Sequence, residues 1–152
     1  MNNEKLSLDG LIFEATKVVM KDYILTITLN RPNKKNAINS VMMNEVNYAL
    51  AYAKQERKIR VVIIDAEGDI FCAGADLSNP KSESNVPKLT DHDDLSLSIR
   101  HLYKPVICKI QGSVLAGALL IVANATHAVA VKDAKFSAPE IKRGLWPFMV
   151  MA

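Results

Sequence analysis

The chain has 152 residues, of which 49% are hydrophobic and 23% are charged, a balance typical of one globular domain over residues 1–152. Its net charge of +3 is too small and too dispersed to indicate a nucleic-acid partner. No segment is apolar for long enough to span a bilayer, and residues 1–9 lack the pattern of a signal peptide. We therefore expect a cytoplasmic protein without a membrane span.

The N-terminal part of the chain predicts a hairpin followed by a helix. Residues 11–19 and 23–30 have the composition of two strands, and Lys21 and Asp22 lie in the turn between them. A polar loop follows, and Asn39 or Ser40 can cap a helix that runs to about residue 57. One stripe of that helix is apolar and predicts its buried face: Met42, Val46, Ala49, Leu50 and Ala53.

A branched apolar run at residues 61–65 predicts a strand that is buried on both faces. It leads to the stretch 71–77, in which three small residues, Ala73, Gly74 and Ala75, allow the main chain to turn sharply. Such a bend leaves amide hydrogens that point outward. We expect it to offer an N–H group to an anion or a carbonyl oxygen.

The rest of the chain alternates between strands and helices, which indicates α/β layers. Residues 78–94 are polar and aperiodic and predict a mobile surface loop. The remaining expected elements are a short helix at 94–103, a strand at 104–112, an apolar helix at 113–125, and short strands at 127–131 and 135–137.

The apolar helix carries Ala116 and Gly117 in its first turn. Helix N-termini present unpaired amides and a partial positive charge, which favour a developing negative charge. Two donors from two separate turns can form an oxyanion hole. The alternative for both stretches is a pair of tight turns with no ligand.

Four blocks of the sequence together resemble the enoyl-CoA hydratase/isomerase, or crotonase, family. They are Asn30-Arg31-Pro32 with Asn36-Ala37, Phe71-Cys72-Ala73-Gly74-Ala75-Asp76, Lys104-Pro105-Val106 with Gly112 and Gly117, and Ala134-Lys135-Phe136 with Pro139-Glu140. Any one of them is a weak signal, but the four in this order are specific.

The resemblance implies a spiral of β-β-α units and an acyl-CoA thioester as substrate. It also implies a homo-oligomer, trimeric in the family, built by a helical C-terminal region that covers the acyl pocket. The sequence given contains no such region, so we expect a short form of the fold. No separate cofactor is expected, because coenzyme A is part of the substrate.

The resemblance also assigns catalytic positions. The backbone amides of Ala75 and Gly117 would hold the thioester oxygen, and Glu140 would carry the proton. Family members that add water generally use a second glutamate, and its position here holds Leu120, which favours double-bond isomerisation. The structural alternative for Glu140 is a helix N-terminal carboxylate that is satisfied by local amides.

Coenzyme A would run along two segments of the chain. Lys34, Lys35 and Ala37 match the family segment that lines the nucleotide and pantetheine path, although each lysine could equally be a solvated loop residue. In the first donor turn, Ala73, Asp76 and Leu77 would contribute main-chain groups near the substrate.

Two other kinds of site are not expected. The three histidines, His92, His101 and His127, have no ligand spacing, so we expect no metal site. Cys72 and Cys108 lie in apolar contexts and predict buried reduced thiols, with no identifiable base that would make either one a nucleophile.

Two hypotheses follow for function. The first is a hydratase/isomerase-type enzyme in which Ala75, Gly117 and Glu140 act on an acyl-CoA. The second is a non-catalytic copy that binds an acyl-CoA or a full-length relative, which Leu120 and the short C-terminal part favour.

Overall fold

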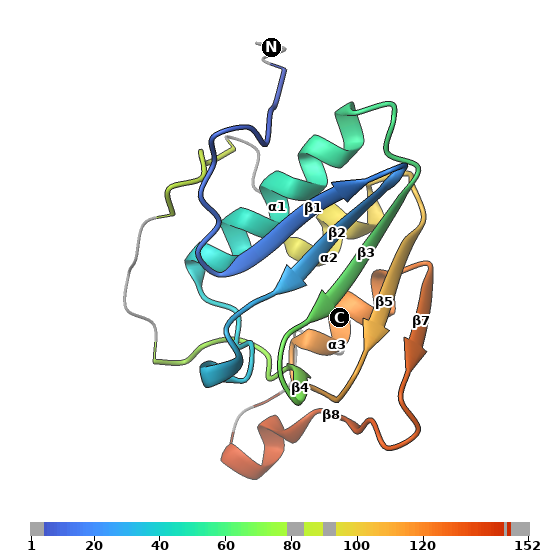
Figure 1. The fold of residues 1–152 in the computed structure, drawn as a ribbon. Coiled ribbons are helices and arrows are strands. Elements are labelled where there is room, and N and C mark those ends of the chain that lie inside the picture. Colours follow the sequence, from blue (N-terminus) through green and yellow to red (C-terminus); the bar gives the residue numbers. More distant parts are fainter. Residues whose placement is uncertain (1–4, 79–83, 90–93, 145, 147–152) are drawn as a thin grey trace.

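The computed structural model describes residues 5–78, 84–89, 94–144 and 146. Two sheets organise the chain (Figure 1). The larger has the order β1-β2-β3-β5-β7 and the smaller the order β4-β6-β8. Among the described strands only the β1–β2 pair is antiparallel, and the other pairs are parallel.

The order of elements is a repeat of two strands and one helix. The first unit comprises β1 (Thr16–Lys21), β2 (Ile24–Leu29), the 3-10 turn η1 (Pro32–Lys34) and α1 (Ser40–Gln55). The second comprises β3 (Val61–Ala66), β4 (Ile70–Cys72) and α2 (Leu95–Arg100). The third comprises β5 (Val106–Ile110), β6 (Ser113–Leu115) and α3 (Ala118–Asn124). A fourth begins with β7 (His127–Ala130), β8 (Phe136–Ser137) and the 3-10 turn η2 (Pro139–Arg143). The predicted spiral of β-β-α units is confirmed.

The core lies between the larger sheet and the helices on one of its faces (Figure 1). In β2 the alternating residues Leu25, Ile27 and Leu29 are fully buried. The predicted stripe of α1 is buried as well, and the predicted cap is confirmed because the Asn39 side chain accepts a hydrogen bond from the Met42 N–H. Each of the larger apolar side chains, such as Leu25 or Met42, contributes about 1.5–3 kcal/mol to stability when it leaves water.

The C-terminal end of α1 is capped by a residue that is distant in the sequence. The Lys104 ammonium donates hydrogen bonds to the carbonyl oxygens of Ala53 and Glu56, the latter at 2.8 Å. Burial lowers the pKa of Lys104. Lys104, one of the motif residues, therefore joins the end of α1 to the start of β5.

Three sequence predictions need correction. The strand at 61–65 is not buried on both faces, because Val62 and Ile64 are buried while Val61 and Ile63 are only half-buried. Residues 113–115 form β6 and not the first turn of a helix, since they pair with both β4 and β8. The first strand begins at Thr16 and not at residue 11.

The predicted loop 78–94 falls partly outside the described residues, which omit 79–83 and 90–93. Within the described part, Val86 is buried and its carbonyl oxygen accepts a hydrogen bond of 2.8 Å from the Asn44 side chain. Asn85, Pro87 and Lys88 of this part are exposed, so it lies on the surface and is anchored to α1 through Val86.

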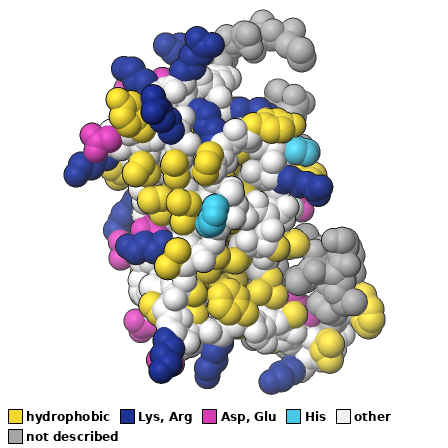
Figure 2. Space-filling model, turned by 90° about the vertical axis from the view of Figure 1, so that its right-hand side faces the viewer, with side chains coloured by type: hydrophobic (Ala, Val, Ile, Leu, Met, Phe, Trp, Pro, Cys, Tyr) yellow, Lys and Arg dark blue, Asp and Glu magenta, His cyan; other side chains and the backbone are white. Residues whose placement is uncertain are grey.

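Hydrophobic side chains gather on the side of the molecule where β7 forms the edge of the larger sheet (Figure 2). All four residues of β7 and both residues of β8 are exposed. No helix in the described part of the chain is both long enough and apolar enough to cross a membrane.

Candidate functional site

The first donor turn follows β4 and is fixed against the loop that precedes α1. Three backbone hydrogen bonds flank Ala75 without using its N–H group: Ala73 N to Lys35 O at 3.0 Å, Ile38 N to Gly74 O at 2.8 Å, and Asp76 N to Ile38 O at 2.9 Å. Gly74 has a φ of +87°, which a residue with a Cβ rarely adopts. The turn therefore leaves the Ala75 amide available, and Ala75 is exposed.

Asn36 holds the loop in front of this turn, a role that the sequence did not reveal. It is fully buried and has a φ of +52°. Its side chain accepts a hydrogen bond from Arg31 N at 2.8 Å and donates to the carbonyl oxygens of Glu67 and Ile70, both at 2.8 Å. The Cys72 thiol donates to the Asn36 carbonyl oxygen at 3.0 Å. Asn36 thus fixes the loop to β4 and to the turn between β3 and β4.

A second link between the loop and the turn is ionic. The Arg31 guanidinium lies 3.0 Å from an Asp76 carboxylate oxygen, and both side chains are mostly buried. The Ser78 hydroxyl donates to the other oxygen at 2.6 Å, and together with Arg31 it holds the pKa of Asp76 below its usual range. The Asp76 side chain is therefore already committed to structure, which leaves main-chain groups for any substrate contact at this residue.

The second donor turn joins β6 to α3. Ala116 has a φ of +54°, and its N–H donates to Ser137 O of β8 at 2.8 Å. Gly117 is the N-cap of α3, and its carbonyl oxygen accepts from Leu120 N at 3.2 Å. Within the described residues, neither Gly117 N nor Ala75 N donates a hydrogen bond to a backbone oxygen.

The two turns meet in space. A Cβ atom placed on Gly74 would lie 2.7 Å from the Ala116 Cβ, 3.1 Å from Leu115 O and 3.2 Å from Gly117 N. The absence of a side chain at Gly74 is therefore what allows the turns to approach. Residues 75 and 117, which are far apart in the chain, line one pocket.

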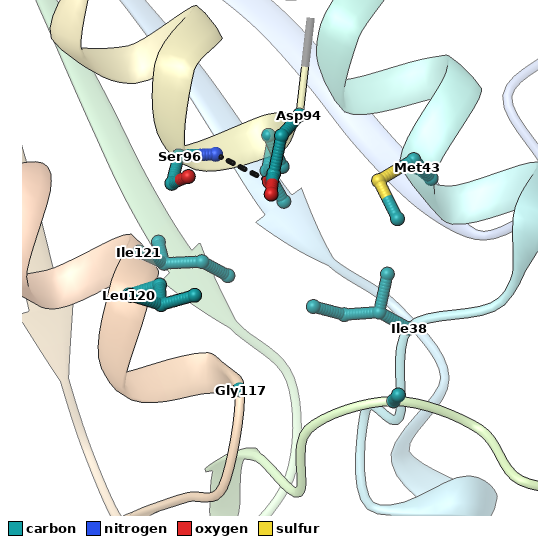
Figure 3. Close-up of a pocket in the computed structure, with 9 residues that line it drawn as sticks. Ile38, Met43, Asp94, Ser96, Gly117, Leu120 and Ile121 are labelled. Carbon is teal, nitrogen blue, oxygen red and sulfur yellow. Dashed lines mark hydrogen bonds between the residues drawn. The ribbon is translucent and has the colours of Figure 1, made fainter. Parts of the chain in front are cut away.

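Nine residues line this pocket, whose empty space is about 460 Å³ when the open solvent at its mouth is included: Ile38, Met43, Ala75, Asp94, Leu95, Ser96, Gly117, Leu120 and Ile121. Its sides are mostly apolar, and Figure 3 shows Leu120 and Ile121 of α3 across from Ile38 and Met43. A pocket of this kind, apolar with a few polar groups, is typical of a small-molecule site.

Three of the predicted site residues thus come together: Ala75, Gly117 and Leu120. The other predicted substrate contacts do not line the pocket. Lys34 and Lys35 are exposed on the loop before α1, Ala37 is half-buried, and Leu77 is 69% exposed. Their contacts with coenzyme A stay predictions.

Glu140 is not among the residues that line the pocket. It belongs to η2, which begins two residues after Ser137, the residue bonded to Ala116 N. Its side chain is half-buried, and its Oε2 atom is shielded from solvent with no hydrogen-bond partner in the described part of the chain. A buried carboxylate oxygen without a donor is uncommon in folded proteins. Its role as the proton carrier stays a prediction.

Sequence reasoning did not connect Asp94 and Ser96 with this site. The sequence predicts residue 94 only as the start of a helix, and the structure shows it as the N-cap of α2, accepting from Ser96 N at 3.1 Å. No sequence pattern could have found their second role, because α2 reaches the pocket only through its packing beside α1 and α3 (Figure 1).

The buried titratable groups outside the pocket are structural. Burial raises the pKa of Cys72 to about 11 and that of Cys108 to about 12, so neither is an activated nucleophile. Glu45 of α1 is fully buried and accepts hydrogen bonds from Glu14 N, Ala15 N and the Thr16 hydroxyl. Among the described residues, no cluster of ligand side chains could hold a metal ion.

The chain is similar in sequence to known proteins. Residues 20–152 match the model of the enoyl-CoA hydratase/isomerase family. A mevalonyl-coenzyme A hydratase of Aspergillus fumigatus is 34% identical over 128 residues, which cover 81% of this chain and 47% of the relative. A 1,2-epoxyphenylacetyl-CoA isomerase of Escherichia coli is 29% identical over 135 residues, which cover 82% of this chain and 50% of the relative.

The fold is shared as well. The crystal structure of a probable enoyl-CoA hydratase of Mycobacterium smegmatis superposes with a TM-score of 0.72 at 31% identity, covering 84% of this chain and 53% of that one. The chain therefore spans about half the length of the relatives that it matches. The family match, the fold and the paired turns lead to one conclusion: the chain belongs to the enoyl-CoA hydratase/isomerase family.

Proposed function

We propose that the protein acts on an acyl-CoA thioester, with the thioester oxygen held by the N–H groups of Ala75 and Gly117. The observation that carries this proposal is that two amides from distant turns line one pocket and are not used by the backbone hydrogen bonds around them. Preorganised donors of this kind stabilise the negative charge that develops on a carbonyl oxygen, and the loss of one costs about a hundredfold to a thousandfold in rate.

The reaction that we propose is the movement of a double bond along the acyl chain. A base removes a proton from the carbon next to the thioester carbonyl, and the electrons of that bond form an enolate on the oxygen held by the amides. The proton then returns to the far carbon of the conjugated system, so no other reactant is consumed. Leu120 supports isomerisation over hydration, because an apolar side chain lines the pocket and cannot activate water.

Glu140 is the residue that we propose as the base. It follows the strand that is bonded to the second donor turn, and one of its oxygens is buried without a partner among the described residues. A substrate that brought an acidic C–H group to this oxygen would satisfy it. Coenzyme A arrives as part of the substrate, so the reaction as proposed needs no separate cofactor.

The test is a pair of positional isomers of an unsaturated acyl-CoA, followed by ultraviolet absorbance as each is converted. Glu140→Gln should reduce turnover by at least about a hundredfold while the circular dichroism spectrum is retained. Glu67→Gln makes the same chemical change at an exposed glutamate, which is paired with Lys17 outside the pocket, and it serves as the matched control with normal turnover. Normal turnover by Glu140→Gln would remove Glu140 from the mechanism.

A second candidate is a non-catalytic protein that binds an acyl-CoA. The position of Glu140 outside the pocket lining and the apolar Leu120 favour it. Binding of both isomers with no absorbance change for either would establish this second candidate and reject the first.

A further inference from the structure

The pocket has two chemically different ends. Figure 3 shows Gly117 at one end and Asp94 at the other, with apolar side chains from two sides between them. The end at Gly117 offers amide hydrogens, as argued above. The end at Asp94 holds the one charged side chain among the described residues that line the pocket, together with the half-buried Ser96.

The polar end presents an acceptor next to a hydroxyl group. One Asp94 carboxylate oxygen accepts the Ser96 N–H at 3.1 Å, and in the described part of the chain no hydrogen bond is recorded to its other oxygen. The Ser96 hydroxyl can donate or accept. A ligand group that both donates and accepts one hydrogen bond fits this pair, and a hydroxyl group is such a group. A carboxylate does not fit, because it offers no donor and has the same charge as Asp94.

We infer that the Asp94 end of the pocket is a specificity subsite for the distal end of the acyl chain. It favours an acyl-CoA that carries a hydroxyl group there and disfavours one that ends in a carboxylate. The inference rests on the proposed function, since it assumes that the thioester lies at Ala75 and Gly117. The apolar sides between the two ends would enclose the methylene groups of the chain.

The experiment compares the binding of saturated acyl-CoA esters by isothermal titration calorimetry, so that no turnover is needed. For each chain length in a series, three esters end in a methyl, a hydroxyl or a carboxylate group. At the length that spans the pocket, the hydroxyl ester should bind most tightly, and the carboxylate ester should bind about fivefold more weakly than the methyl ester, the effect of one charge pair in a solvated site.

Asp94→Asn is the decisive variant, because asparagine caps a helix as well as aspartate does and the fold should be kept. It removes the charge, so the penalty against the carboxylate ester should disappear. Ser96→Ala should reduce the preference for the hydroxyl ester. Asp133→Asn, an exposed change outside the pocket, is the matched control and should alter neither ratio.

The outcomes separate the inference from the function on which it rests. Tight binding of the methyl ester, with a carboxylate-to-methyl ratio that is the same in the native protein and in Asp94→Asn, would overturn the subsite and leave the proposed function standing. Failure of every ester to bind at any length would overturn the proposed function and the subsite with it.

Discussion

Gly74→Ala tests the claim that the two donor turns meet because position 74 has no side chain. The substituted residue would keep a φ of +87°, which costs an L-residue about 1–2 kcal/mol. Its methyl group would lie 2.7 Å from the Ala116 Cβ and 3.1 Å from Leu115 O, so the second turn must move, at about 1–3 kcal/mol for such overpacking. The lower entropy of the unfolded chain returns about 0.4–1 kcal/mol. We expect a net loss of about 1–4.6 kcal/mol, with a central value of about 3 kcal/mol.

Urea unfolding measures this loss, and Gly10→Ala isolates the backbone term. Gly10 also has a positive φ, of +75°, but a Cβ there would meet nothing within 4 Å. Gly10→Ala should therefore cost about 1 kcal/mol, and the excess at Gly74 measures the contact between the turns. Ala116→Gly should stabilise Gly74→Ala more than it stabilises the native protein. In both it relieves the positive φ of residue 116, but only in the variant does it also remove the closest atom. Moving the turns apart should also weaken acyl-CoA binding.

Equal losses for Gly74→Ala and Gly10→Ala would refute the reasoning, as would full acyl-CoA affinity in Gly74→Ala. Either result would mean that the turns do not depend on the missing side chain for their approach. The double variant sharpens the test. If Ala116→Gly leaves the loss at Gly74 unchanged, the methyl groups are not the atoms in conflict.

Three further predictions follow from single residues. Gly117→Ala should change the unfolding free energy by less than about 1 kcal/mol, because the φ of Gly117 is −56° and an added Cβ would meet nothing within 4 Å. The added methyl group would lie at the pocket, so calorimetry should show that the affinity for acyl-CoA falls about tenfold. Asn36→Ala should lower the free energy of unfolding in urea by about 3 kcal/mol, since it removes three part-buried hydrogen bonds, to Arg31 N and to the carbonyl oxygens of Glu67 and Ile70. A loss under about 1 kcal/mol would contradict that account. Burial raises the pKa of Glu45, so the folded protein holds this proton more tightly than the unfolded chain does. Its contribution to stability should fall as pH rises from 4.5 through the raised pKa, and urea unfolding at several pH values should show that Glu45→Gln removes this dependence.

Local patterns in the sequence were sufficient for most elements. The composition of residues 23–30 predicted the strand β2, and a cap at Asn39 or Ser40 predicted where α1 begins. These signals are local, because a strand or a helix turns its side chains with a fixed period. The residues after β4 also predicted an available amide, since small residues and a glycine permit the turn that exposes it.

Where local sequence signals gave the wrong secondary structure, pairing between strands that are distant in the sequence had determined it. Residues 113–115 are apolar enough for a helix, but they form β6 because β4 and β8 supply hydrogen-bond partners on both sides. In the same way, the burial of Val61 and Ile63 on the second face of β3 depended on which elements pack against that side of the sheet. A short apolar run carries no information about partners that lie far away in the chain.

From its sequence alone this protein specified the strand and helix periods, two turns able to expose amides, and a match to one family across four motifs. The tertiary structure alone decided that residues 75 and 117 line a common pocket, that Asp94 and Ser96 form its other end, and that Glu140 lies outside its lining. The physical reason is that periodicity and turn chemistry act between neighbours in the chain, whereas a pocket is formed by side chains and amides that only the packing of separate elements brings together.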